Sequence, residues 1–253
     1  ALMAFSGAIL RVLEQDKGFT LKSTAKYVAG HSLGEYSALA AAGALSLTDT
    51  ARLLKIRGQS MQAAVPVGEG AMAALLGLDL PDAQKLAEAA AQGDVCEAAN
   101  DNAPGQVVLS GAKAAIERAV EMASEFGARR AVLLPVSAPF HCALMKPAAD
   151  AMQDALAEID IKAPAVPLVA NVVAGDVTDP EEIRKRLVEQ VTGAVRWREC
   201  VQFMAGNGVT TVCEIGAGRV LTGLARRIER SLDAISVGTP EEIDAAAEKL
   251  GAA

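Results

Sequence analysis

VAGHSLGEYSALAAAGALS, from Val28 to Ser46, is the stretch that decides the fold. Residues 30–34 within it, GHSLG, fit the Gly-x-Ser-x-Gly pattern, in which a serine lies on a tight turn between a strand and a helix. The apolar residues 25–29 predict a short strand before the turn, and the alanine-rich run after it predicts a helix. The sequence therefore predicts a sharp strand-to-helix turn that exposes the hydroxyl of Ser32.

Ser32 has two interpretations from this pattern alone. At such a turn its hydroxyl is a candidate nucleophile, and the backbone N–H of Leu33 points where an oxyanion would form. The alternative is a glycine-flanked turn serine that only caps the helix. We take Ser32 as the candidate nucleophile, because the strand and the helix predicted on either side supply the context that the motif requires.

Residues 66–137 predict a small domain inserted into a larger one. Their apolar runs and turn residues follow the order strand, helix, strand, strand, helix, strand, at 70–78, 81–93, 95–100, 106–111, 112–127 and 128–137. This β-α-β-β-α-β order is the split β-α-β pattern of a ferredoxin-like unit. We therefore expect a compact ferredoxin-like insertion.

The rest of the chain, residues 1–65 and 138–253, is predicted to form one discontinuous core domain. Its patterns alternate between helices, at 1–15, 33–45, 47–65, 145–159, 179–191, 197–208 and 219–230, and strands, at 25–29, 166–173 and 210–218. Thr48 is the expected N-cap of the helix at 47–65. Such alternation favours an α/β fold with a mostly parallel sheet and helices on both faces.

The composition excludes several classes of protein. Of 253 residues, 51% are hydrophobic and 22% are charged, as in globular proteins, and no uninterrupted apolar run is long enough to span a membrane. The net charge of −7 argues against a nucleic-acid partner. Four cysteines without Cys-x-x-Cys spacing and only two histidines favour a cytoplasmic protein without a metal site. The chain opens within a predicted helix, so we expect missing N-terminal sequence.

The two histidines limit the choice of a general base for the serine. His31 is next to Ser32 in the sharp turn, so its side chain is expected to point away. His141 follows Pro139 in an extended loop, where the predicted insertion rejoins the core, and such junctions commonly border clefts. His141 is therefore the candidate base, and a structural histidine is the alternative.

Two further features have an ordinary structural interpretation. The helical pattern alone makes Arg57 an arginine whose stem packs against apolar neighbours and whose head reaches solvent. Gly216 and Gly218 lie between a predicted strand and a helix and resemble half of a dinucleotide fingerprint. The third glycine falls at Gly223, outside the required spacing, so we exclude a nicotinamide site.

Six segments of the chain together resemble bacterial malonyl-coenzyme A:acyl carrier protein transacylases of type II fatty acid synthesis. They are GHSLGEYSALAAAGALSL, RGQSMQ, GAMAALLGL, NDNAPGQVVLSG, HCALMKPAA and GRVLTGLARRI, and the similarity runs from residue 1 to about 230. The resemblance implies an α/β-hydrolase-like core that carries the serine, an inserted ferredoxin-like small domain, and an active site between them.

The resemblance also implies roles for individual residues. Ser32 would be the acylated nucleophile, His141 its general base, and Arg57 the cation that binds the malonyl carboxylate. The backbone carbonyl of Gln190 would orient the histidine in place of an acidic side chain. The Leu33 N–H would be one oxyanion donor.

Selectivity and partners follow from the same resemblance. Leu33 after the serine and Phe140 before the histidine are similar to the malonyl-selective pattern of related acyltransferases. The implied reaction is a two-step transfer of malonyl from malonyl-coenzyme A to the phosphopantetheine thiol of acyl carrier protein, by a monomer without a cofactor. The family's Gly-Gln-Gly-Ser-Gln segment, whose first Gln helps to form the oxyanion hole, is not in this sequence.

Two other functions stay open at this point. A serine thioesterase or other hydrolase on a related core would need an acidic triad member, and the available candidates by chain order all fall in the predicted insertion: Asp79, Asp82, Asp94 and Asp101. A paralogue that binds carrier protein without turnover is the second alternative, and intact Ser32, His141 and Arg57 oppose it.

Overall fold

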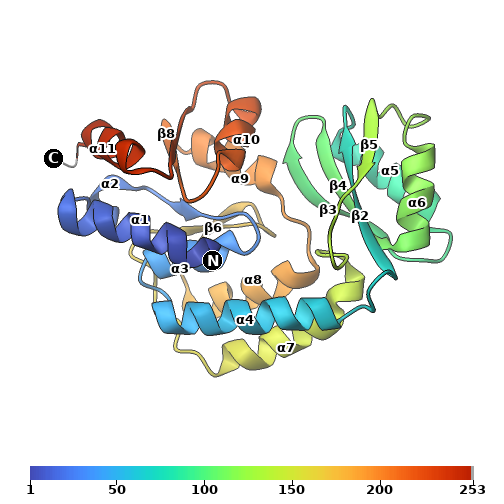
Figure 1. Ribbon diagram of the computed structural model, residues 1–253, viewed down its shortest axis with the longest axis horizontal. Coiled ribbons are helices and arrows are strands. Elements are labelled where there is room, and N and C mark those ends of the chain that lie inside the picture. Colours follow the sequence, from blue (N-terminus) through green and yellow to red (C-terminus); the bar gives the residue numbers. More distant parts are fainter. Residues whose placement is uncertain (252–253) are drawn as a thin grey trace.

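The computed structural model describes residues 1–251 and has a mixed α/β fold (Figure 1). The serine turn belongs to a three-stranded sheet of order β1-β6-β7. Its strands are β1 (Val28–Ala29), β6 (Leu168–Ala170) and β7 (Gly175–Val177). β1 and β6 are parallel, with Val28 opposite Leu168. Their carboxyl ends therefore lie side by side at one edge of the sheet.

The parallel strand pairing expected for the core is present, but it is divided between two separate short sheets. β8 (Thr211–Ile215) and β9 (Asp233–Val237) form a parallel pair of their own. β7 is antiparallel to β6, because only residues 171–174 join the two strands and a crossover needs a much longer connection. The strands predicted at 25–29, 166–173 and 210–218 are present but shorter, and β7 and β9 were not predicted.

Helices surround these sheets, and the long helix α4 passes beneath the first one (Figure 1). The first of them are α1 (Leu2–Asp16), α2 (Leu21–Thr24), α3 (Gly34–Ala41), α4 (Leu47–Ala63) and the 3-10 turn η1 (Ala143–Met145). The others are α7 (Lys146–Ala157), α8 (Pro180–Thr192), α9 (Trp197–Gly206), α10 (Val220–Ile228) and α11 (Pro240–Lys249). α4 packs against α7, and α7 packs against α8. Fully buried side chains fill the space between them and the sheet, among them Tyr36, Leu39, Leu53, Met152 and Leu156.

The start of α4 corrects one expectation. Ser46, not Thr48, is its N-cap, because Ser46 has an extended backbone and its hydroxyl accepts a hydrogen bond from the Asp49 N–H at 3.0 Å. Thr48 already lies in the first helical turn. Both residues suit the cap chemically, and the sequence alone does not distinguish them.

Residues 70–133 form a separate four-stranded antiparallel sheet with two helices packed against it (Figure 1). Its strand order is β3-β4-β2-β5. The elements are β2 (Gly70–Leu76), α5 (Leu80–Ala91), β3 (Cys96–Ala103), β4 (Gln106–Ala112), α6 (Lys113–Met122) and β5 (Arg130–Leu133). Their order along the chain is the predicted one, although α6 and β5 are shorter than expected. Leu75, Leu86, Leu109 and Ile116 are fully buried in the core of this unit.

The small unit is joined to the core through its strand β3. The Asp101 N–H donates to the Val195 carbonyl at 3.0 Å, and the Val195 N–H donates to the Ala99 carbonyl at 2.8 Å. The buried carboxylate of Asp101 pairs with Arg198 of α9 at 2.8 Å. The Asp101 carboxylate therefore pairs with Arg198 and not with His141, the candidate base.

Two general features of the described residues complete the fold. No helix within residues 1–251 combines the length and apolar character needed to cross a bilayer. The four cysteines are all free.

Candidate active site

Ser32 lies on the predicted turn between β1 and α3, and its backbone is in the left-handed region with φ of 52°. A serine rarely adopts this conformation, and such strain is typical of a nucleophile held on a sharp turn. A Cβ atom added to Gly30 would lie 2.0 Å from the Gly34 carbonyl carbon. The first glycine of the motif is therefore required by a close approach of backbone to backbone.

Asn171, which follows β6, holds this turn from the neighbouring strand. Its Oδ1 atom accepts a hydrogen bond from the Ser32 N–H at 2.8 Å, and its Nδ2 atom donates to the Gly30 carbonyl at 2.8 Å. The side chain is completely buried. Asn171 was not among the residues predicted from the sequence, although its place directly after an apolar strand was a usable signal.

His141 lies in the connection between β5 and η1 and is buried beside Ser32, with φ of 60°. Its Nδ1 atom is 2.8 Å from the Gln190 carbonyl oxygen, which can only accept, so Nδ1 carries the proton. Nε2 is then free to accept from the Ser32 hydroxyl at 2.7 Å. Burial, and next the charge of Arg57, lowers the pKa of His141 to about 3. The imidazole is therefore neutral near pH 7, with Nε2 unprotonated and facing the Ser32 hydroxyl.

Arg57, in the middle of α4, turns its guanidinium into the site rather than toward solvent. Its Nη2 atom donates to the Ser32 hydroxyl oxygen at 3.0 Å and to Gln190 Oε1 at 3.0 Å. The side chain is 7% exposed, and Cζ lies 5.8 Å from the centre of the Tyr36 ring. Burial lowers the pKa of Arg57. The solvent-reaching interpretation from the helical pattern was wrong, because the face of α4 that carries Arg57 is covered.

Gln190 and Glu35 complete a buried polar network behind these three side chains. Gln190 lies on α8, and its Nε2 atom donates to the Ser32 carbonyl at 2.9 Å and to Glu35 Oε2 at 2.5 Å. The other carboxylate oxygen of Glu35 accepts from the Asn171 N–H. Burial raises the pKa of Glu35 to about 8, against the hydrogen bonds from Asn171 and Gln190 and the charge of Arg57. Sequence analysis did not single out Glu35.

The remaining predicted residues border this network. Leu33 is the N-cap of α3, and Phe140 packs against the core cluster next to the histidine. The His31 ring points to the other side of the turn, where Nε2 is 2.8 Å from Asn102 Oδ1 and the ring lies 5.6 Å from that of Trp197.

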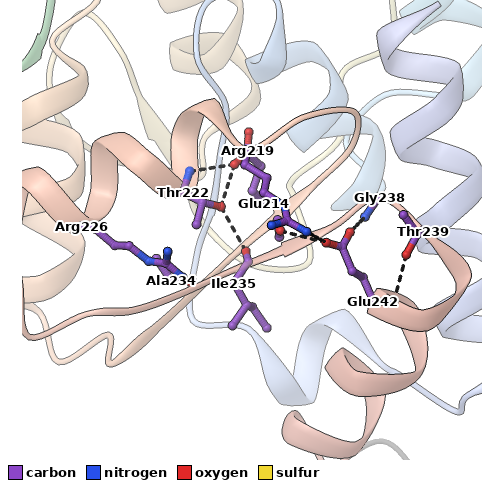
Figure 2. Close-up of polar contacts among 10 residues, drawn as sticks. Glu214, Arg219, Thr222, Arg226, Ala234, Ile235, Gly238, Thr239 and Glu242 are labelled. Atoms are coloured by element: carbon purple, nitrogen blue, oxygen red, sulfur yellow. Dashed lines mark hydrogen bonds and ion pairs between the residues drawn. The ribbon is translucent and has the colours of Figure 1, made fainter.

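The glycine loop at residues 216–218 lies beside a network of hydrogen bonds around Glu214, which Figure 2 shows. The Glu214 carboxylate accepts hydrogen bonds from the N–H groups of Leu221 (3.0 Å) and Thr222 (2.7 Å) and from the Thr222 hydroxyl (2.7 Å). The N-terminus of α10, where a phosphate would bind in a dinucleotide site, is therefore filled by a carboxylate of the same chain. Within residues 1–251, no group of three or more His, Cys, Asp or Glu is placed to hold a metal ion.

The geometry suits one kind of chemistry. A serine hydroxyl that donates to a neutral histidine is set up to lose its proton as it attacks a carbonyl carbon. A buried guanidinium 3.0 Å from the same oxygen would favour an acyl group that carries a negative charge. The arrangement therefore supports acyl transfer of an acidic acyl group.

Comparisons with known proteins identify a family that performs such chemistry. The acyl transferase domain family matches residues 1–243. The malonyl CoA-acyl carrier protein transacylase of Escherichia coli (strain K12) is 48% identical over 248 residues, which are 98% of this chain and 79% of that protein.

Solved structures give the same result. The acyl-carrier-protein-S-malonyltransferase from Bartonella henselae is 59% identical with a TM-score of 0.96, over 98% of this chain and 79% of that one. A structure of a type II PKS acyl-carrier protein in complex with its malonyl-transacylase matches with 44% identity and a TM-score of 0.94, over 98% of this chain and 79% of that one. The chain belongs to the malonyl CoA-acyl carrier protein transacylases, within the acyl transferase domain family.

Proposed function

We propose that this enzyme moves malonyl from malonyl-coenzyme A to the phosphopantetheine thiol of acyl carrier protein through a malonyl ester of Ser32. The observation that carries this proposal is the convergence of three side chains from distant segments. Ser32 Oγ lies 2.7 Å from His141 Nε2 and 3.0 Å from Arg57 Nη2. A nucleophile, its base and a cation for the malonyl carboxylate therefore meet at one oxygen atom.

In the first half-reaction, Ser32 Oγ attacks the thioester carbonyl carbon while its proton passes to His141 Nε2. The carbonyl oxygen becomes an oxyanion, for which the Leu33 N–H at the start of α3 is the proposed donor. When the tetrahedral intermediate collapses, the C–S bond breaks and the leaving thiolate of coenzyme A takes the proton from His141. The products are the malonyl-serine ester and free coenzyme A.

The second half-reaction reverses these steps with a different thiol. The phosphopantetheine thiol of the carrier protein gives its proton to His141 and attacks the ester carbonyl. Collapse breaks the C–O bond to Ser32, which recovers the proton from His141. The Gln190 carbonyl, 2.8 Å from Nδ1, keeps the imidazole oriented through both steps. No cofactor is needed, because the thioester already carries the activated acyl group.

Arg57 is the proposed malonyl selector. A planar guanidinium forms two parallel hydrogen bonds with a carboxylate, and its Nε atom is buried without a hydrogen-bond partner among the described residues. An acetyl group would leave this buried cation unpaired, and a site built for a polar group rejects an analogue without it by roughly 10⁴. Leu33 and Phe140 are proposed to line the acyl group on either side.

The domain organisation is part of the proposal. We infer that residues 66–137 are a ferredoxin-like small domain, which the antiparallel strand order β3-β4-β2-β5 supports. Residues 1–65 and 138–253 would then be an α/β-hydrolase-like core that carries Ser32. His141 follows directly after the small domain, which supports an active site between the two.

The proposed partners are malonyl-coenzyme A and acyl carrier protein, and a related malonyl-transacylase has been seen in complex with its carrier protein. A monomeric state and a cytoplasmic location stay predictions.

Mass spectrometry of the purified protein after a brief incubation with malonyl-coenzyme A tests the proposal. We expect a malonyl adduct on the peptide that contains Ser32, its absence in Ser32→Ala, and its retention in Ser231→Ala, which removes an exposed serine. Added holo acyl carrier protein should discharge the adduct faster than water does. An unmodified Ser32, or discharge by water that is as fast as discharge by the carrier protein, would contradict the transferase mechanism.

A further inference from the structure

Glu35 is a buried carboxylate that the proposed mechanism does not use. It lies in the first turn of α3, three residues after Ser32, and is 1% exposed. Both of its oxygen atoms face donors, one the Asn171 N–H and the other the Gln190 side-chain amide. A carboxylate satisfies both donors, since each of its oxygens only accepts.

The contacts of Glu35 form a chain that ends at the nucleophile. Glu35 Oε2 accepts from Gln190 Nε2 at 2.5 Å, Gln190 Oε1 accepts from Arg57 Nη2 at 3.0 Å, and Arg57 Nη2 donates to Ser32 Oγ at 3.0 Å. The Gln190 amide has two different ends, so its direction decides what Arg57 meets. Gln190 Nε2 also donates to the Ser32 carbonyl at 2.9 Å, so Glu35 and that carbonyl together keep the amide nitrogen on their side and the amide oxygen toward the guanidinium.

We propose that Glu35 is a positioning residue for malonyl selection, because its carboxylate, together with the Ser32 carbonyl, fixes the direction of the Gln190 amide and thereby holds the Arg57 guanidinium beside Ser32. This inference rests on the proposed role of Arg57 as the group that binds the malonyl carboxylate. It gives a reason for an ionisable side chain at a position where burial opposes the charged form.

Replacing Glu35 by glutamine would disrupt this chain of hydrogen bonds. The new amide keeps the size of the side chain and offers its oxygen to the Asn171 N–H, so its NH₂ group faces Gln190. If the Gln190 amide keeps its direction, two donors oppose each other and the amide is pushed away from residue 35. If it turns over, its oxygen opposes the Ser32 carbonyl and its NH₂ group faces Arg57. In either case the hydrogen bond from Arg57 to the amide oxygen is weakened or lost, so the guanidinium is held less well where the malonyl carboxylate would bind.

The test measures single-turnover acylation of Ser32 by malonyl-coenzyme A and by acetyl-coenzyme A at about pH 8.5, above the pKa of about 8 that burial gives Glu35. We expect Glu35→Gln to lower the malonyl rate about tenfold, the effect of one lost hydrogen bond to a charged group, and the acetyl rate less than about twofold. In an Arg57→Ala background, Glu35→Gln should change neither rate further, because it acts through Arg57. Glu214→Gln, the same change at the end of β8, should leave both rates unchanged.

A second variant keeps the inference testable if the Glu35→Gln protein does not fold. Gln190→Met removes the side-chain link from its other end and keeps the backbone carbonyl that orients His141, so it should lower the ratio of malonyl to acetyl rates in the same direction. Equal losses for the two thioesters, or unchanged rates in Glu35→Gln, would overturn the inference. Failure of Arg57→Ala itself to change the ratio would instead overturn the proposed role of Arg57.

Discussion

Two strand-to-helix connections of this molecule have similar backbone features but different side-chain contacts. The connection from β1 to α3 and the connection from β8 to α10 both contain glycines and a residue with positive φ. A glutamate that accepts backbone hydrogen bonds lies next to each of them, Glu35 in the first turn of α3 and Glu214 near the end of β8. In the first, Glu35 faces Gln190 and the Ser32 hydroxyl is bonded to other side chains. In the second, Glu214 turns back onto the helix of its own connection (Figure 2).

The difference lies in what approaches each loop. The serine turn is reached by side chains from α4, α8, the end of β6 and the loop before η1, all distant in sequence. The loop after β8 is contacted by its own helix and by β9, whose Val237 carbonyl accepts from the Gly216 N–H at 3.0 Å. Ser6 of α1 lies close to Gly216, and Glu242 of α11 accepts a hydrogen bond from Arg219 at 2.6 Å. A glycine-rich turn alone therefore provides a conformation, and packing of distant segments makes it a candidate active site.

The largest effect is expected from Gly30→Ala compared with Gly218→Ala. A Cβ at residue 30 would lie 2.0 Å from backbone, so the turn must move by more than about 1 Å, and a displacement of that size costs about 10²-fold or more in rate. A Cβ at residue 218 meets nothing within 4 Å, and alanine costs only about 1–2 kcal/mol there because φ is +89°. Ser32 acylation rates and urea unfolding measure both effects.

The comparison of the two loops would be wrong if the two glycine variants lost acylation equally. It would also be wrong if Gly30→Ala kept the wild-type rate.

Arg57→Ala compared with Arg219→Ala should give the next largest effect. Arg57 is buried against Ser32, whereas the Arg219 side chain is 74% exposed and pairs with Glu242 at 2.6 Å. We expect Arg57→Ala to lower malonyl transfer about 10²-fold and acetyl transfer much less, because only malonyl offers a carboxylate to a guanidinium. Arg219→Ala should change neither rate, since exposed ion pairs contribute little. Equal losses of malonyl and acetyl transfer in Arg57→Ala would make that arginine purely structural.

Sequence patterns predicted the local features of the molecule well. The serine turn, the strand before it, the helix after it and the order of elements in residues 70–133 all follow from short-range periodicity and turn residues, and the structure has them. The N-cap of α4 was misplaced by two residues, because Ser46 and Thr48 have the same capping chemistry. β7 was missed because three residues are too few to show a period, and β9 because the burial of its residues does not alternate along the strand.

The site was predictable only where its residues carry a motif or a family resemblance. The helical pattern indicated an arginine whose head reaches solvent, and the resemblance, not that pattern, supplied the proposed role of Arg57. Glu35 was missed because an acidic residue in the first turn of a helix is common and usually interacts with the helix dipole in water. Asn171 was missed because its partner is 139 residues away. Such contacts depend on the pairing of β1 with β6, which no local pattern shows.

The smallest effect is expected from Glu214→Ala, which tests the second loop alone. Its carboxylate satisfies two N–H groups at the start of α10, and loss of a helix cap costs about 1–2 kcal/mol of stability. Malonyl transfer should stay at the wild-type rate, because no described contact of Glu214 leads to Ser32. Urea unfolding and single-turnover acylation of one preparation give both quantities. Unchanged stability with a reduced rate would mean that this loop belongs to the active site, and that the difference between the two connections is smaller than their contacts indicate.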